Sequence, residues 1–327
     1  MEMCALPRRR LRLFVVATLV GVYGIFGQSA PGGLRQSSIP EPERLCSKVM
    51  LRFRCLRQPP VYHFGETIRA RLSLSTNGQL GYTALPDVRR GFFHEIIVAE
   101  PREDAIDPST LDPRIRIGGS GGWSEDLDRE IDVNEWIQFQ RPGRYVLHVV
   151  LKHIVPLPVT EKSGKPWLDC ELKSNAEPVE VLPRDTQWEA AELARIGTLL
   201  ESEYTRFRGA SALRYLNTPE AAAALARWYV GLSGEPVNSE LAKGIFESRC
   251  AGIVQSELEK VLRSDTPFSS NVIGVLTSLE VRRQFINRPP PSDPKAAQTW
   301  SREHSEVFDS VKRKYSAVAA AAGHPVR

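Results

Sequence analysis

The chain has 327 residues, of which 42% are hydrophobic and 25% are charged. These fractions argue against a disordered chain, a coiled coil or a polytopic membrane protein, and the length allows two domains with separate cores. Most of the formal net charge of +4 lies in the first 30 residues, so the rest of the chain is nearly neutral. A nearly neutral chain has no general field that attracts nucleic acid, so we expect no nucleic-acid partner.

The chain begins with the pattern of a secretory signal peptide. A basic cluster at residues 8–12 precedes an uncharged apolar run over residues 13–26, and small residues follow. This order predicts a signal peptide over residues 1–29, with cleavage after Ser29 or nearby. The alternative is an uncleaved membrane anchor, although the run is shorter than the ~20 apolar residues of a spanning helix. We expect a periplasmic or extracellular protein that meets a membrane only through this leader, if the leader is uncleaved.

A change of pattern then predicts a β region. Residues 30–43 are rich in Pro, Gly, Ser and Gln, which indicates a flexible tether. From residue 44 to 184, short segments of alternating apolar and polar residues are separated by turn residues, as in a β-sandwich. Seven strands match an immunoglobulin-like (Ig-like) sandwich, and they are predicted over residues 48–56, 66–75, 92–99, 134–139, 144–154, 167–172 and 177–182.

The segment that precedes the fifth of these strands carries the strongest local signal. Pro142 and Gly143 fit the central positions of a type II turn, because proline fixes φ and glycine accepts a positive φ. Tyr145 then opens the strand, where it resembles the tyrosine corner of Greek-key sandwiches, whose hydroxyl locks a crossing loop. We expect this motif to be architectural.

The periodicity changes from strand to helix near residue 185, and residues 185–287 are predicted to be helical. Thr186 and Glu189 have the spacing of a capping box. Further helices are expected near residues 211–216, 219–228, 239–263 (broken in the middle) and 269–285. The first helix is marked by one apolar stripe, made of Leu193, Ile196, Leu200, Tyr204 and Phe207.

A weak internal repeat suggests the class of this helical region. Thr218-Pro219 fits an N-cap followed by a first-turn proline, and the same pair recurs as Thr266-Pro267, 48 residues later. This spacing is close to the ~40–47 residues of HEAT-type repeats, so a HEAT-like domain is predicted. Residues 288–294 are rich in proline and indicate a stiff linker, and residues 295–327 are expected to form a C-terminal helix.

Three segments, residues 65–75, 139–145 and 174–183, resemble a group of uncharacterised exported bacterial proteins. Those proteins couple an Ig-like β-sandwich to a HEAT-like helical region. The resemblance covers most of the mature chain. It implies export and this two-part architecture, and it implies no reaction.

Two cysteines form a candidate disulfide. An exported chain meets an oxidising compartment, where cysteines pair. Strand parity places Cys55 and Cys170 each on the inward face of its predicted strand, which makes Cys55–Cys170 the best candidate pair. The alternative is two buried free thiols, because parity does not establish proximity.

One loop has the letters of a catalytic motif. Gly118-Gly-Ser120-Gly-Gly122 matches a nucleophile elbow, which requires a strained turn from strand to helix and a later acid and histidine. An acidic stretch follows instead, so a flexible loop is the favoured interpretation and a secreted serine hydrolase using Ser120 is the alternative. The sequence contains no nucleotide-binding or zinc motif. We therefore expect no enzyme, no cofactor and no metal site.

An acidic segment follows that loop, and its carboxylates share one face if the segment is extended. Such a face could hold Ca²⁺, as in a calcium-dependent adhesion module, because calcium prefers oxygen ligands. The alternative is a solvated acidic edge that resists strand pairing. The four carboxylates are those of Asp126, Asp128, Glu130 and Asp132.

Two predicted strands carry a basic face, opposite in charge to the acidic segment. Its arginines alternate with core-facing residues on two predicted strands, so they should share an outer face that could bind an anionic polysaccharide, a lipid headgroup or an acidic partner. The alternative is internal neutralisation by the acids of residues 126–132. The candidate anion- or partner-binding residues are Arg52, Arg54, Arg69 and Arg71.

Together these patterns predict a multidomain, all-β plus all-α protein, an Ig-like β-sandwich followed by a HEAT-like α-helical region. Sandwich rims and helical concavities bind through their surfaces and need no catalytic residues. We therefore expect a non-catalytic binding or assembly module of the cell envelope or extracellular space, with a protein or an envelope polysaccharide as its partner.

Overall fold

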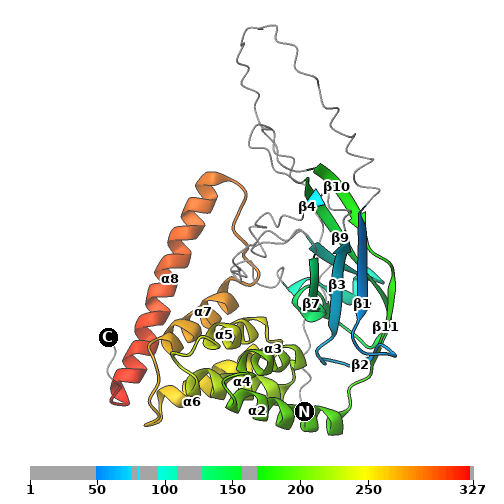
Figure 1. Ribbon diagram of the computed structural model, residues 1–327. Helices are drawn as coiled ribbons and strands as arrows, with labels where there is room; N and C mark the ends of the chain where they lie inside the picture. The colour runs from blue at the N-terminus through cyan, green and yellow to red at the C-terminus, as the bar shows by residue number, and fades with distance from the viewer. Residues whose placement is uncertain (1–48, 76–79, 82–94, 109–126, 157–167, 325–327) are drawn as a thin grey trace, which may run out of the picture.

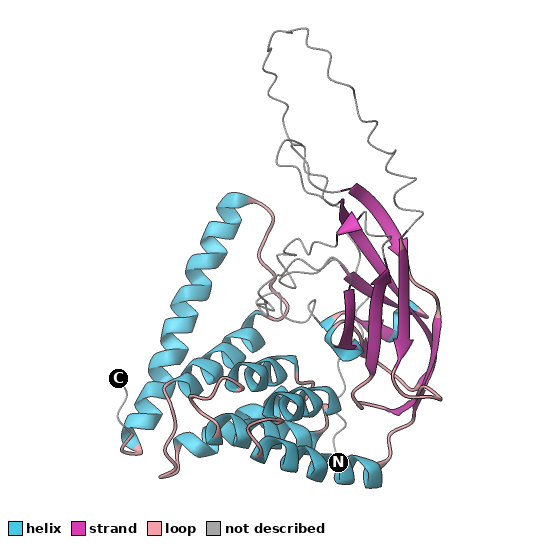
Figure 2. Ribbon diagram, in the orientation of Figure 1, coloured by secondary structure: helices cyan, strands magenta, loops and turns pink. Residues whose placement is uncertain are grey.

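The computed structural model describes residues 49–75, 80–81, 95–108, 127–156 and 168–324. In this part of the chain, the last strand ends at Leu182 and the first α-helix begins at Thr186. Figures 1 and 2 show the strands gathered on one side of the molecule and the helices on the other. The prediction of strands followed by helices is confirmed, while the Ig-like and HEAT-like assignments stay predictions.

One antiparallel sheet has the strand order β1-β3-β7. Its apolar residues alternate with charged ones, so one face is buried and the other carries the charges. Strand β7 continues the sheet with the acidic segment, which the sequence prediction had not assigned as a strand. The three strands are β1 (Met50–Cys55), β3 (Arg69–Ser75) and β7 (Leu127–Asp132).

The free edge of β1 is covered by side chains. Asn175 accepts a hydrogen bond from the Phe53 N–H at 2.9 Å and donates one to the Phe53 carbonyl at 2.8 Å. Glu177 accepts from the Cys55 N–H at 3.0 Å. These two side chains therefore bond to the outward backbone groups of β1 as a neighbouring strand would.

The second sheet is built around one long strand, β9 (Gly143–Pro156). Antiparallel partners lie on it, and β2 is added parallel to β11. Its other members are β2 (Val61–His63), β4 (Leu80–Gly81), β5 (Glu95–Glu100), β10 (Leu168–Lys173) and β11 (Glu177–Leu182), and a separate pair joins β6 (Ala105–Ile106) to β8 (Gln138–Phe139).

Both sheets contribute to one apolar core. Phe53 and Leu72 from the first sheet belong to the same buried cluster as Leu147 and Val149 from the second. Their removal from water is the main favourable contribution to folding of this region. The predicted strand over residues 134–139 is wrong, because residues 133–135 form a 3₁₀ turn and only the two residues of β8 are extended.

The turn before β9 contains the predicted tyrosine corner. The Tyr145 hydroxyl donates to the Arg141 carbonyl at 2.6 Å, and the Tyr145 ring packs on Phe139. The prediction of a type II turn is wrong. Gly143 is paired with Val181 as the first residue of β9, so its backbone is that of a strand and its φ is not positive.

In the described part of the chain, seven α-helices form the second apolar core. The longest, α8, runs along one side of the stacked helices (Figure 1). No described helix is both long enough and apolar enough to span a membrane. The helices are α2 (Thr186–Glu201), α3 (Arg206–Leu216), α4 (Pro219–Gly231), α5 (Asn238–Glu247), α6 (Ala251–Leu262), α7 (Asn271–Phe285) and α8 (Pro294–Ala321).

The first helix differs from its prediction at both ends. Asp185, one residue before the expected cap, accepts from the N–H groups of residues 187 and 188, so the capping box at Thr186 is wrong. Glu189 pairs instead with Arg184 at 2.9 Å. The predicted apolar stripe breaks where α2 ends at Glu201, and beyond it Tyr204 and Phe207 are exposed.

Of the two Thr-Pro pairs, only the first caps a helix. Thr218 accepts from the Ala221 N–H at 3.1 Å at the start of α4. Thr266-Pro267 lies before α7, which begins four residues later at Asn271. The two positions are therefore not structurally equivalent, and the pair does not define a repeat.

Candidate functional site

The β and α regions meet at a close backbone contact. Gly65, in the turn between β2 and β3, lies against the end of α3, where a Cβ atom at position 65 would stand 2.8 Å from the Leu216 carbonyl oxygen. The His63 ring stacks on Trp188 of α2, with ring centroids 4.5 Å apart. On the other side, Arg249 donates to the Phe139 carbonyl at 3.0 Å. The junction is therefore made by residues distant in sequence.

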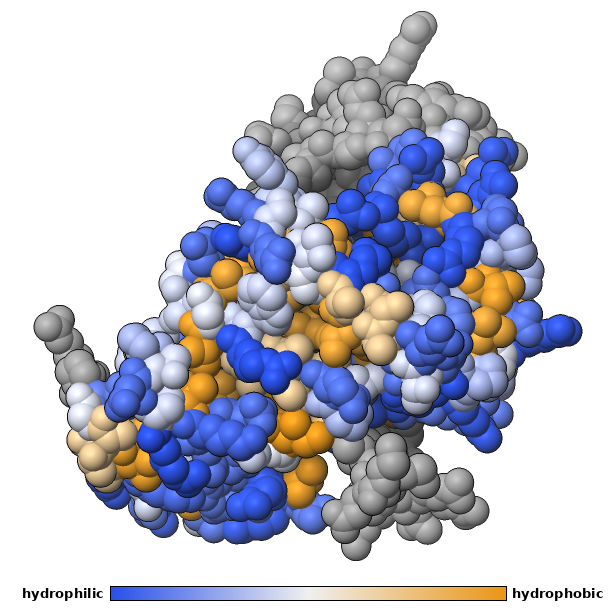
Figure 3. Space-filling model, turned by 90° about the horizontal axis from the view of Figure 1, so that it is seen from below, coloured by the Kyte–Doolittle hydropathy of each residue, from blue (hydrophilic) through white to orange (hydrophobic). Residues whose placement is uncertain are grey.

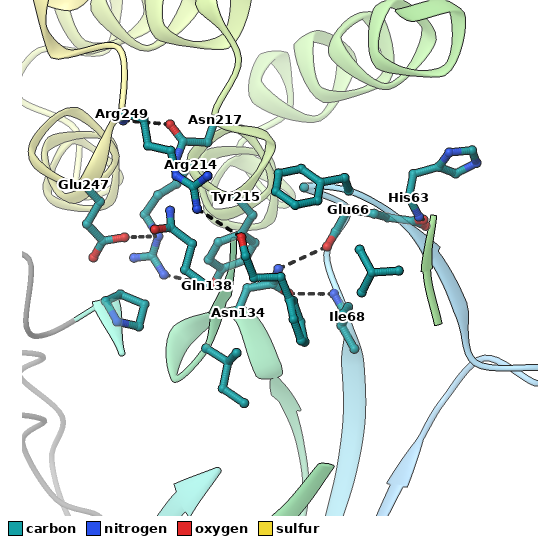
Figure 4. A pocket seen from close by; sticks show the side chains of 16 residues that line it. His63, Glu66, Ile68, Asn134, Gln138, Arg214, Tyr215, Asn217, Glu247 and Arg249 are labelled. Atoms are coloured by element: carbon teal, nitrogen blue, oxygen red, sulfur yellow. Dashed lines mark hydrogen bonds and ion pairs between the residues drawn. The ribbon is translucent and has the colours of Figure 1, made fainter. Parts of the chain in front are cut away.

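A buried arginine lies at the centre of this junction. Arg214 of α3 is 3% exposed and faces carboxylates from both regions. Glu240 and Glu247 of α5 lie 2.6 and 3.4 Å from its guanidinium, and Glu135 of the β region forms a third ion pair. The Tyr215 hydroxyl donates to Glu135 at 2.6 Å. We refer to these five residues as the Arg214 cluster, and Figure 4 shows Arg214, Tyr215 and Glu247 among them.

The Arg214 cluster holds more negative than positive charge. Burial opposes the charge of Arg214, but Tyr215 and the three glutamates outweigh it and hold its pKa well above the usual range. Burial also raises the pKa of Glu247 to about 7, and the charges of Glu135 and Glu240 add to this effect. Glu247 is therefore the carboxyl group that carries a proton as the pH falls below neutrality.

Replacing Glu247 by glutamine should remove a pH dependence of stability. Because the pKa of Glu247 is raised in the folded protein, its ionisation makes the folded state less stable as pH rises from about 4.5 through 7. Glu247→Gln should match the wild type at pH 5 and exceed its free energy of unfolding at pH 8 by about 1–3 kcal/mol. Urea unfolding at both pH values measures the difference. Parallel profiles for the two proteins would contradict it, and Glu306→Gln on the exposed face of α8 is the control.

The space beside the Arg214 cluster is too small for an organic substrate. The cavity has a volume of about 30 Å³, which is room for about two water molecules. Its position between the two regions and its buried ion pairs indicate that the cluster fixes their relative orientation.

A much larger cleft opens between the charged face of the first sheet and helices α2 and α3, with a volume of about 790 Å³. Arg57 pairs with Glu66 and Arg69 with Glu130, and Arg195 lies 2.6 Å from Glu192. We call this the charged cleft. Its charged residues are Arg57, Arg69, Arg129, Arg195, Arg208, Glu66, Glu130, Asp132, Glu135 and Glu192.

A third cavity lies between α2 and α4, with a volume of about 450 Å³. Small apolar side chains, Ala190, Leu193 and Ala194, form much of its lining. The view from below shows hydrophobic residues near the centre of the molecule and in smaller groups toward its edges, with hydrophilic residues between them (Figure 3). The lining of the cavity between α2 and α4 therefore offers few groups that could take part in a reaction.

The predicted basic face is brought together and then largely neutralised. In the sheet register Arg69 is opposite Asp132 and Arg71 is opposite Glu130. Arg71 lies 3.3 Å from Glu130, and it is 3.7 Å from Asp128. This is the internal neutralisation that the sequence analysis gave as the alternative. The same ion pairs engage Asp128, Glu130 and Asp132, which were candidate calcium ligands.

The other two arginines of this face, Arg52 and Arg54, lie on the exposed side of β1. Neither forms an ion pair with a carboxylate in the part of the chain that the structure describes. They remain candidate contact residues at the edge of the sheet.

The remaining predicted site residues have mixed outcomes. Cys55 is a buried free thiol, and burial, aided by Glu177, raises its pKa to about 11. The side chain of Cys170 lies outside the described residues, as do Ser120 and Asp126. Within the described ranges, no group of three or more His, Cys, Asp or Glu residues is placed to hold a metal.

Sequence reasoning missed the Arg214 cluster. Its one local signal is the position of Arg214 among the small and apolar residues that α3 buries, such as Ala210 and Leu213. A charge at such a position requires opposite charge nearby, but the sequence does not indicate that Glu135, 79 residues earlier, supplies part of it.

Comparisons with family models, curated proteins and solved structures give no match for this chain.

Proposed function

We propose that this protein is an exported, non-catalytic binding module, with an Ig-like sandwich and a HEAT-like helical region that hold the charged cleft open between them. The supporting observation is the cleft itself, which is large, open and lined by side chains from both regions. The basic and apolar leader pattern of residues 1–29 supports export.

The charges of the cleft favour a protein segment as its ligand. Among the described residues, five arginines and five carboxylates line it, so a polyanion such as an acidic polysaccharide would meet carboxylates as often as arginines. A peptide that carries both charges can place each opposite a complementary group, which gives specificity and a faster association rate. We therefore propose a partner with an extended segment of mixed charge.

Arg208 provides the test. It is exposed, lines the cleft, and forms no ion pair with a carboxylate in the described ranges, so its replacement should leave the fold intact. We expect wild-type protein to bind mixed-charge ten-residue peptides better than all-acidic, all-basic or alginate probes. Arg208→Glu should weaken that binding about tenfold, which is about 1.4 kcal/mol. Binding measured by fluorescence anisotropy checks this.

The matched control is Arg227→Glu, which makes the same change of charge at an exposed position of α4, away from the residues that line the cleft, and should leave binding unchanged. Equal losses in the two variants, or preferred binding of alginate, would overturn the assignment of the cleft. Cleavage of a bound peptide, or labelling by a fluorophosphonate probe for reactive serines, would overturn the non-catalytic function.

A further inference from the structure

The small cavity at the β–α junction is lined by two arginines with very different surroundings. Arg214 has three carboxylates, whereas Arg249 pairs with none in the described part of the chain. Among the described residues, the one acceptor bonded to the Arg249 guanidinium is the neutral Phe139 carbonyl. A guanidinium that is largely removed from water is normally matched by a negative charge, so Arg249 lacks the partner that its surroundings require.

The surroundings of Arg249 add to the positive charge. Arg184 and Arg249 both approach the Phe64 ring, at 5.0 and 6.0 Å from its centroid. Burial lowers the pKa of Arg249, and repulsion by Arg184 lowers it further. Glu189 forms an ion pair with Arg184, whereas no carboxylate of the described residues pairs with Arg249.

A buried hydrogen-bond donor lines the same cavity. Asn217 caps the end of α3 with a left-handed backbone, φ 50°, and is 7% exposed. Its Oδ1 accepts a hydrogen bond from the backbone N–H of Arg249 at 2.9 Å, and this bond fixes the orientation of the side-chain amide (Figure 4). The Nδ2 group is then left buried without an acceptor. Buried donors of this kind are rare, because each one left unpaired costs about 1–3 kcal/mol.

The carboxylates that line the cavity are engaged elsewhere. Glu66 pairs with Arg57, and Glu247 turns to Arg214. Neither carboxylate therefore serves as the negatively charged partner of Arg249. The cavity volume of about 30 Å³ sets the size of what can enter.

We propose that Arg249 and the Asn217 amide bind a small monovalent anion, of the size of chloride, in this cavity. The site is separate from the charged cleft and does not depend on its function. The bound anion would join α3, the start of α6 and strand β8, and so stabilise the junction.

The test is a titration of the full-length protein with sodium chloride, in which sodium methanesulfonate keeps the ionic strength constant. Specific binding should raise the melting temperature by about 2–4 °C and broaden the ³⁵Cl NMR line. Acetate and phosphate, which are both larger than chloride, should give no protection.

Two variants separate binding from general salt effects. Arg249→Gln should lose both the chloride dependence and the line broadening. Asn217→Asp places a carboxylate next to Arg249, so its stability should no longer depend on chloride and should be at least that of the chloride-free wild type. Arg227→Gln, at an exposed position of α4 away from the cavity, should keep the wild-type response. Equal melting temperatures of the wild type in the two salts without line broadening, or broadening that persists in Arg249→Gln, would overturn the proposal.

Discussion

Arg214→Ala is expected to lower the free energy of unfolding by about 3–5 kcal/mol. The substitution removes the cation and leaves Glu135, Glu240 and Glu247 facing one another in a buried site. Because Glu135 belongs to the β region and the other two to α5, the loss falls on the junction as well as on the helices. Urea unfolding followed by circular dichroism measures the change, and hydrogen exchange should become faster on both sides of the junction.

Lys260→Ala is the control for this prediction. It removes an exposed ion pair with Glu257 within α6, and such pairs contribute about 0–1 kcal/mol. If Arg214→Ala costs no more than Lys260→Ala, the cluster does not hold the two regions together. Unchanged exchange rates around Gly65 would lead to the same conclusion.

Gly65→Ala is expected to destabilise the protein by about 3 kcal/mol, for two reasons that add. The backbone at Gly65 has φ +88°, a conformation that costs about 1–2 kcal/mol for an L-residue. The new Cβ would also stand 2.8 Å from the Leu216 carbonyl oxygen. Since that neighbour is backbone, the turn or the end of α3 must move. The melting temperature and the free energy of unfolding measure the effect.

Gly234→Ala separates the two reasons. Gly234 has φ +89° but nothing within 4 Å of its Cβ position, so the substitution should cost about 1–2 kcal/mol through the backbone alone. The difference between the variants is the energy of the contact between the two regions. Equal costs at positions 65 and 234 would show that this contact contributes little.

The sequence predicts those parts of the fold that depend on local periodicity. Alternation in β1 and β3 follows from the pleat, and each buried position there is apolar. The start of α4 follows from Thr218-Pro219, since a cap and a first-turn proline act within four residues. Strand β7 was harder to predict from the sequence, because its acidic residues are favourable in a strand only when they lie opposite the arginines of β3.

The candidate sites depend on distant contacts, which explains why the sequence indicates them poorly. The arginines at 69 and 71 could be placed on one face from parity, but their neutralisation required the pairing of β3 with β7. Arg249 shows no local pattern at all. Its unmatched charge becomes visible only when β8, the end of α3 and the start of α6 come together.

The side chains that cover β1 also limit how partners can attach. An open strand edge invites another chain to extend the sheet, which is a route both to recognition of extended peptides and to aggregation. At Phe53 that route is closed, because the Asn175 amide already occupies the backbone N–H and carbonyl. An incoming chain would have to displace Asn175 before it could add to the sheet at this position, so docking there has to proceed through side chains.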